Sequence, residues 1–76
     1  MIATIKGNSY EMGRKEFKGL IAKISKSIPD KPTIIALEKD GYAEMRNDVF
    51  QTQKDLTNAV TEWNKKGFKV KYKRGI

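Results

Sequence analysis

Apolar and polar residues follow a strand-like pattern in some segments of the chain and recur with the helical period in others. These patterns divide the chain into its predicted elements. Residues 2–6 are predicted to form a short strand, and the Gly7-Asn8 pair that follows is typical of a turn. Residues 9–12 can then pair back on the first strand as the second arm of a hairpin. The chain is therefore expected to begin with one strand, or with two if the hairpin forms.

A helical period replaces this pattern over residues 14–27. The spacing i, i+3, i+4, i+7, i+11 of one buried stripe is occupied by Phe17, Leu20, Ile21, Ile24 and Ile28. The side chains that fall away from this stripe, toward solvent, are Lys15, Lys18, Lys23 and Lys26. Pro29 disfavours helical geometry at the residue before it, so the helix is expected to end there and residues 29–32 to form a stiff connection.

Residues 33–38 and 42–46 are predicted to form an antiparallel hairpin. The Asp40-Gly41 pair between these two segments is a strong signal for a tight turn. We expect Asn47-Asp48 to interrupt the second strand, and Val49 and Phe50 to anchor the next connection to the core.

A second amphipathic helix and an alternating strand complete the chain. Thr52 is a candidate N-cap, Asp55 follows it by three residues, and Gly67 is suited to end the helix. The buried stripe of this helix is expected to consist of Leu56, Ala59, Val60 and Trp63. Residues 68–73 then alternate strictly between apolar residues and lysine, which is the pattern of a half-buried strand.

The element order β(β)αββαβ predicts a single α+β domain over residues 1–76. Two amphipathic helices have to bury their stripes, and one face of a shared sheet serves both. We therefore expect a ferredoxin-like plan, with two helices packed on one face of a mostly antiparallel four- to five-stranded sheet. If the N-terminal hairpin forms, a five-stranded variant with a different strand order is the main alternative. The stripes of both helices are expected to meet in one contiguous core.

Composition narrows the class of protein. The chain has 76 residues and no cysteine, so it can form neither disulfides nor thiolate metal sites. A secreted domain this small usually needs such cross-links, which favours a cytoplasmic location. We identify no signal peptide, and the longest wholly apolar run, residues 34–37, is far too short to span a bilayer. We therefore expect no membrane contact.

The candidate catalytic chemistry is sparse. The sequence contains no histidine and no cysteine, which are the commonest general base and a common nucleophile. The serines have no evident activating base, the carboxylates form no metal-ligand pattern, and the glycines match no nucleotide-binding motif. We therefore expect a protein that is not an enzyme, binds no metal and uses no cofactor.

Charge is distributed unevenly along the chain. The formal net charge is +7, and the last 14 residues contain six basic side chains and no acidic one. In the predicted last strand, Lys69, Lys71 and Lys73 are expected on one face and the apolar residues on the other, with Lys6 and Arg46 near the lysine row. The candidate site for nucleic acid or another anionic partner is Lys65, Lys66, Lys69, Lys71, Lys73 and Arg74. The alternative interpretation is an edge strand whose lysines prevent pairing between sheet edges.

The chain resembles small uncharacterised accessory proteins of phages and mobile elements in Gram-positive bacteria. The resemblance is one of general sequence character and lies in the segments IKGNSYEMGRKEFKGLI and WNKKGFKVKYK. The resemblance extends over most of the chain but contains no diagnostic motif. It implies a short protein that handles nucleic acid or modulates a host or defence component. No functional residue is carried over from it.

Two functional hypotheses follow. The first is an accessory protein that binds DNA or RNA through backbone phosphates with its lysine-rich C-terminal strand. The aromatic signature of RNA-recognition motifs is missing, and Tyr42 is the one aromatic side chain expected on an open face of the sheet. The second is a protein–protein interaction module, such as a phage-type inhibitor, that docks on an acidic protein surface.

Overall fold

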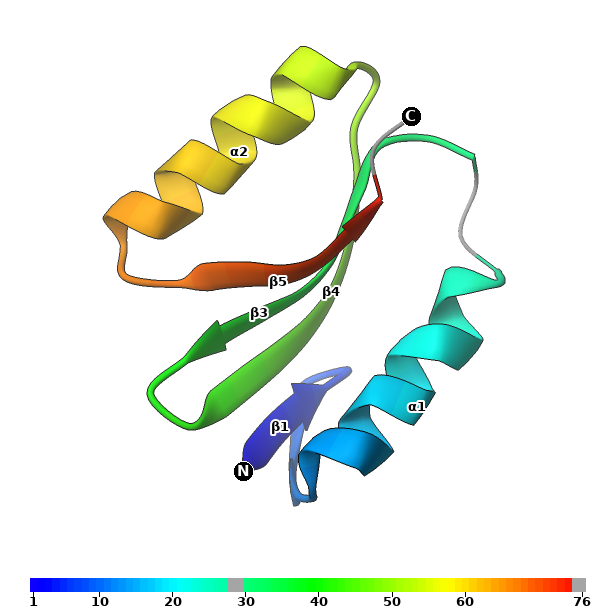
Figure 1. The fold of residues 1–76 in the computed structure, drawn as a ribbon, viewed down its shortest axis with the longest axis vertical. Helices are drawn as coiled ribbons and strands as arrows, with labels where there is room; N and C mark the ends of the chain where they lie inside the picture. The colour runs from blue at the N-terminus through cyan, green and yellow to red at the C-terminus, as the bar shows by residue number, and fades with distance from the viewer. Residues whose placement is uncertain (28–29, 75–76) are drawn as a thin grey trace.

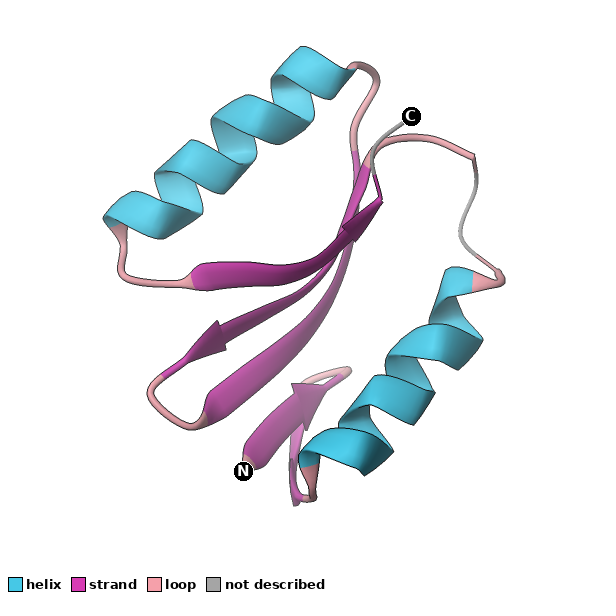
Figure 2. Cartoon of the chain, in the orientation of Figure 1, coloured by secondary structure: helices cyan, strands magenta, loops and turns pink. Residues whose placement is uncertain are grey.

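Within residues 1–27 and 30–74, the segments with strand and helix periods fold into five strands and two helices (Figures 1 and 2). The structure is a computed structural model that describes residues 1–27 and 30–74. In chain order the elements are β1 (Ile2–Ile5), β2 (Asn8–Glu11), α1 (Arg14–Ser25), β3 (Thr33–Lys39), β4 (Tyr42–Val49), α2 (Gln53–Lys65) and β5 (Lys69–Arg74). The predicted roles of Ile28 in the first stripe and of Pro29 as a helix terminator lie outside the described residues.

Both hairpins close through two-residue turns in which each residue has a positive φ. In the Asp40-Gly41 turn the φ angles are 46° and 81°, as the sequence predicts for a tight hairpin. The N-terminal hairpin also forms, but its turn is Lys6-Gly7, with φ angles of 51° and 83°. It lies one residue before the predicted Gly7-Asn8 turn, because the second turn position favours glycine and Asn8 is already paired with Ile5.

The strand order is β2-β1-β4-β3-β5 in one mixed, mostly antiparallel sheet. β1 pairs antiparallel with β2 and parallel with β4, while β3 pairs antiparallel with both β4 and β5. The five-stranded alternative with a different order is therefore confirmed, and the ferredoxin-like order is not found. The physical reason is that β2 and β4 occupy both edges of β1, so the last strand pairs with β3 instead.

The two helices lie on opposite faces of the sheet, which runs between them in Figure 1. Neighbouring side chains of one strand point to opposite faces, and Ile34 and Ile35 of β3 belong to different buried clusters. The α1-side cluster consists of Ala3, Phe17, Ile21, Ile35, Ala36 and Ala43. The α2-side cluster consists of Ile34, Leu37 and Leu56, with Phe50, Ala59, Val60, Trp63, Phe68 and Val70 packed around it. The expectations of a shared face and of one contiguous core are both wrong.

Strand direction explains this arrangement. The connection from β2 through α1 to β3 and the connection from β4 through α2 to β5 both move toward the β5 edge of the sheet. The strands of the first connection run antiparallel to those of the second. Crossover connections share one hand in nearly all proteins. The two crossovers have the same hand and move in the same direction across the sheet, but they join strands of opposite polarity. They therefore have to cross on opposite faces of the sheet.

Local predictions around α2 are confirmed except in the connection that precedes it. The Thr52 hydroxyl accepts a hydrogen bond from the Asp55 N–H at 3.2 Å, and Gly67 follows the helix with a φ of 89°. Phe50 packs against the α2-side cluster, as expected. Val49, however, is 40% exposed and is the last residue of β4. This strand continues through Asn47-Asp48 instead of ending there, although its register against β3 shifts between Met45 and Asp48.

Candidate anion-binding site

The lysines of β5 do not share one face of the sheet. Lys69 lies opposite Glu38 on β3, and the Glu38 carboxylate bonds to Arg14 of α1. Lys73 lies opposite Ile34, which belongs to the α2-side cluster. Cross-strand partners project from the same face. Lys69 is therefore on the face that carries α1, Lys73 is on the face that carries α2, and the prediction of a single lysine row is wrong.

A shift of register within β5 causes this split. Val70 pairs with Leu37 and Tyr72 pairs with Ala36, so Lys71 is an additional residue on β5. An extra residue of this kind is a β-bulge, which reverses the alternation of side chains beyond it. In agreement, Val70 packs in the α2-side cluster, whereas the Tyr72 ring contacts Phe17 of the α1-side cluster edge to face at 6.1 Å between centroids.

Two of the predicted lysines line one cleft with residues from other elements. The cleft has a volume of about 260 Å³ and lies where β3 turns into β4. Its charged and aromatic lining residues are Arg14, Glu38, Lys39, Asp40, Tyr42, Lys69 and Lys71. Four of these side chains are cations and two are carboxylates. We call this the cationic cleft.

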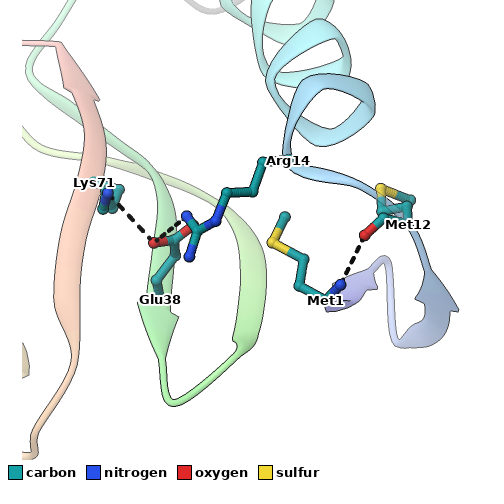
Figure 3. Close-up of polar contacts among 5 residues, drawn as sticks. All are labelled: Met1, Met12, Arg14, Glu38 and Lys71. Carbon is teal, nitrogen blue, oxygen red and sulfur yellow. Dashed lines mark hydrogen bonds and ion pairs between the residues drawn. The ribbon is translucent and has the colours of Figure 1, made fainter.

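Glu38 holds two of the cations in place (Figure 3). Arg14 Nη1 lies 3.1 Å from Glu38 Oε1 and 3.4 Å from Oε2, and Lys71 Nζ lies 3.7 Å from Oε2. The Glu38 side chain is only 12% exposed, whereas those of Arg14 and Lys71 are 69% and 46% exposed. One carboxylate cannot neutralise two cations, so the trio keeps a positive charge that faces solvent.

Arg14 occupies a helix position at which a basic side chain is unfavourable. It is the first residue of α1, where the helix macrodipole is positive and an acidic side chain is preferred. The bond to Glu38 offsets this cost. A residue that opposes local preference and is compensated by a distant partner is more typical of a functional surface than of a helix end chosen for stability.

Lys69 differs from these two cations because its side chain forms no ion pair with any residue in 1–27 or 30–74. It is exposed on the edge strand β5, whereas Tyr42, which is 58% exposed, lies two strands away on β4. Tyr42 pairs with Lys39, which contacts Phe68, so the Tyr42 side chain projects from the face that carries α2. The cleft thus combines an unneutralised amine and two positioned cations, and Tyr42 is a lining residue that belongs to the other face of the sheet.

Lys39 also lines the cleft, but its amine is engaged elsewhere. Lys39 Nζ donates a hydrogen bond to the Lys66 carbonyl at 3.1 Å and lies 5.1 Å from the centroid of the Phe68 ring. A Cβ atom added at Gly67 would come within 3.3 Å of this side chain. Lys39 therefore secures the C-terminal end of α2 rather than serving the cleft.

The remaining predicted site residues lie outside the cleft. Lys65 pairs with Glu62 at 3.5 Å, and Lys66 Nζ lies 5.0 Å from the centroid of the Trp63 ring. Arg74 is half-buried and donates a hydrogen bond to the Ser25 carbonyl at the end of α1. Lys73 is exposed on the other face. The structure thus brings together two of the six predicted side chains, Lys69 and Lys71.

Arg46 and Lys6 do not join the lysines either. Arg46 Nε donates to Asp48 at 2.6 Å and Nη1 donates to Glu44 at 2.9 Å, and its guanidinium carbon lies 4.9 Å from the centroid of the Trp63 ring. The hydrogen bond to Asp48 raises the pKa of the Arg46 guanidinium above its usual value. Lys6 is exposed in the turn between β1 and β2.

Arg14 is the cation of the cleft that the sequence analysis does not single out. In the sequence, Arg14 is simply the first residue of a predicted lysine-rich helix, and it lies 24 positions before Glu38. The exposure of Tyr42 is anticipated, but its place in the same cleft as Lys69 and Lys71 depends on the fold. No local signal indicates either position, because that of Arg14 follows from the packing of α1 on the sheet and that of Tyr42 from the pairing of β4 with β3.

Comparisons of the chain with protein-family models, with curated proteins and with solved structures found no match. The resemblance to phage and mobile-element proteins therefore stays a prediction. Within residues 1–27 and 30–74, no helix is long and apolar enough to cross a membrane, and no three side chains of metal-binding types form a cluster.

Proposed function

We propose that this protein binds nucleic acid through its backbone phosphates at the cationic cleft, with Arg14, Lys69 and Lys71 as the contacting side chains. The observation that carries the proposal is the shared carboxylate. Glu38 positions Arg14 and Lys71 but neutralises only one of them, and Lys69 adds a further exposed amine. The surface therefore presents excess positive charge in a defined geometry.

Each of the three cations suits a phosphate in a different way. A guanidinium offers planar N–H groups that bond phosphate oxygens in pairs, whereas an ammonium acts as a compact point charge. An incoming phosphate takes up the N–H groups of Arg14 that Glu38 leaves unused. The exposed lysines then contribute by releasing condensed counterions from the nucleic acid, which makes binding strongly dependent on salt.

Tyr42 favours single strands over duplexes. Tyr42 lines the same cleft as the cations but projects from the other face of the sheet, so a strand that passes round this end of the sheet can stack one unpaired base on its exposed ring. Such stacking is worth about 1–3 kcal/mol per base. A base within a duplex is already stacked on its neighbours and gains nothing from the ring. Tyr42→Ala should therefore weaken the binding of a single strand more than the binding of a duplex of the same length.

The direct experiment measures the affinity of a mixed-sequence single strand and of the matching duplex from low to moderate salt. We expect a linear decrease of log affinity with log salt concentration, with a slope of about 0.7 per contacted phosphate for a single strand and about 0.9 for a duplex. Lys69→Ala should lower the slope by about one phosphate, and Lys54→Ala on the outer surface of α2 is the matched control. No detectable binding at low salt would contradict the proposal.

Docking on an acidic protein surface is the competing function, because the same cations attract carboxylates. A pull-down from bacterial lysate with and without nuclease separates the two. Nucleic acid recovered with the protein, and lost after nuclease, supports the proposal. A single protein partner that survives nuclease treatment supports the interaction module instead.

A further inference from the structure

The two edges of the sheet are protected to very different degrees. At one edge, β5 has three lysines and a β-bulge, both of which hinder pairing with another strand. At the other edge, β2 (Asn8–Glu11) contains no lysine, no proline and no bulge, and all four of its residues are exposed. An unprotected edge strand is a template for a further strand.

The pairing of β1 with β2 identifies the backbone groups at this edge. Met12 N–H donates to the Met1 carbonyl at 2.9 Å, and the Met1 nitrogen donates to the Met12 carbonyl at 2.9 Å (Figure 3). Hydrogen-bonded and non-bonded pairs alternate along an antiparallel ladder. Tyr10 and Asn8 therefore direct their backbone groups at β1, and Ser9 and Glu11 direct theirs outward.

We propose that β2 pairs antiparallel with β2 of a second copy of this chain, about a symmetry axis at Tyr10. In that register Ser9 of each copy lies opposite Glu11 of the other copy, and both pairs exchange their outward N–H···O bonds. An axis at Glu11 would place two carboxylates opposite each other. An axis at Ser9 would pair Glu11 with Gly7, whose φ of 83° is a turn conformation rather than a strand.

The Tyr10 side chain also favours the register with the symmetry axis at Tyr10. It is 48% exposed and projects from the face that carries α1, since its cross-strand partner Ala3 belongs to the α1-side cluster. On the symmetry axis, the two Tyr10 residues form a non-hydrogen-bonded pair, in which side chains come closest. Aromatic cross-strand pairs of this kind are stabilising. A second copy of β2 therefore brings a second Tyr10 opposite the first. This pairing favours a second copy of the chain over an unrelated peptide.

An interface built on one short strand is small, so the dimer belongs to the weak, concentration-dependent class. Sedimentation equilibrium from micromolar to millimolar protein should show a reversible monomer–dimer equilibrium. Tyr10→Lys should raise the dissociation constant about tenfold or more, because it removes the aromatic pair and places two like charges on the axis. Glu11→Pro should do the same by removing an outward N–H.

Val49→Lys is the matched control, because Val49 is comparably exposed (40%) but lies on the interior strand β4 and does not line the cationic cleft. It should leave the dissociation constant unchanged. Circular dichroism establishes that each variant is folded, and if Glu11→Pro is not, Tyr10→Lys decides alone. A monomer at every concentration, or a dimer equally stable in Tyr10→Lys, would overturn the proposal. Both results are independent of nucleic-acid binding.

Discussion

The two faces of the sheet use their charged residues differently. On the α2 face, Arg46, Lys39 and Lys66 each contact an aromatic ring, a carbonyl or a carboxylate of the protein, whereas Lys73 is exposed and forms no ion pair with another described residue. On the α1 face, Arg14 and Lys71 share one carboxylate and Lys69 has no ionic partner among the described residues. The three cations that make contacts on the α2 face thus stabilise the fold, whereas the three on the α1 face present an excess of positive charge.

The same contrast extends to the buried clusters. Beneath α1 the strands contribute three alanines and one large side chain, Ile35, and the other large side chains come from Phe17 and Ile21 of the helix. Beneath α2 the strands contribute Ile34 and Leu37, and an outer shell of aromatic residues surrounds them. β3 supplies buried side chains to both clusters. The two faces are therefore chemically distinct but mechanically joined through one central strand.

The largest expected effects come from removing one buried side chain on each face. Phe17 and Leu56 are 0% and 1% exposed, so Phe17→Ala should cost about 3–5 kcal/mol and Leu56→Ala about 2–5 kcal/mol of unfolding free energy. Urea unfolding followed by Trp63 fluorescence, which reports on the α2 face, and by circular dichroism should give coincident transitions in both variants. If Phe17→Ala left the Trp63 transition in place, the two clusters would be independent and the joining role of β3 would be wrong.

Much of the secondary structure follows from local sequence, whereas the arrangement of the layers does not. The two helical stripes, the Thr52 cap and the Asp40-Gly41 turn depend on residues a few positions apart. The Leu56 stripe, the cap and the turn are confirmed, and Phe17, Ile21 and Ile24 of the first stripe pack in the α1-side cluster, whereas Leu20 does not belong to it. The faces on which the helices lie depend on which strand occupies the second edge of β1, which no local pattern encodes. The split of the β5 lysines depends on a bulge at Lys71 that a strict alternation conceals.

An intermediate effect is expected at Gly67, between α2 and β5. Its φ of 89° disfavours any side chain, and a Cβ atom would press on Lys39 at 3.3 Å. Gly67→Ala should therefore cost about 1–2 kcal/mol of unfolding free energy. Gly19 in α1 is the control, because a Cβ atom there meets nothing within 4 Å. Gly19→Ala should instead stabilise the protein by about 0.5–1 kcal/mol. Equal effects in urea unfolding would contradict the account of this turn.

A smaller difference in stability should separate a cation of the α2 face from one of the α1 face. Arg46→Ala removes a stacking contact with Trp63 and two ion pairs, so it should cost about 1–2 kcal/mol. Lys71→Ala should cost at most about 0.5 kcal/mol, because Glu38 keeps its bonds to Arg14. Thermal unfolding of the two variants checks the ranking. A Lys71 variant less stable than the Arg46 variant would mean that the cationic cleft is primarily structural.

The central claim is that the position of the cations, and not the net charge alone, determines nucleic-acid binding. Two charge-matched variants test it: Arg14→Gln/Lys69→Gln/Lys71→Gln in the cationic cleft, and Lys54→Gln/Lys65→Gln/Lys66→Gln on and beside α2. Single-strand affinity is measured for both across a salt series. We predict that the cleft variant loses roughly two units of log–log salt slope, about 0.7 for each of three phosphates, while the α2 variant stays close to the original protein. Equal losses in the two variants would contradict the claim.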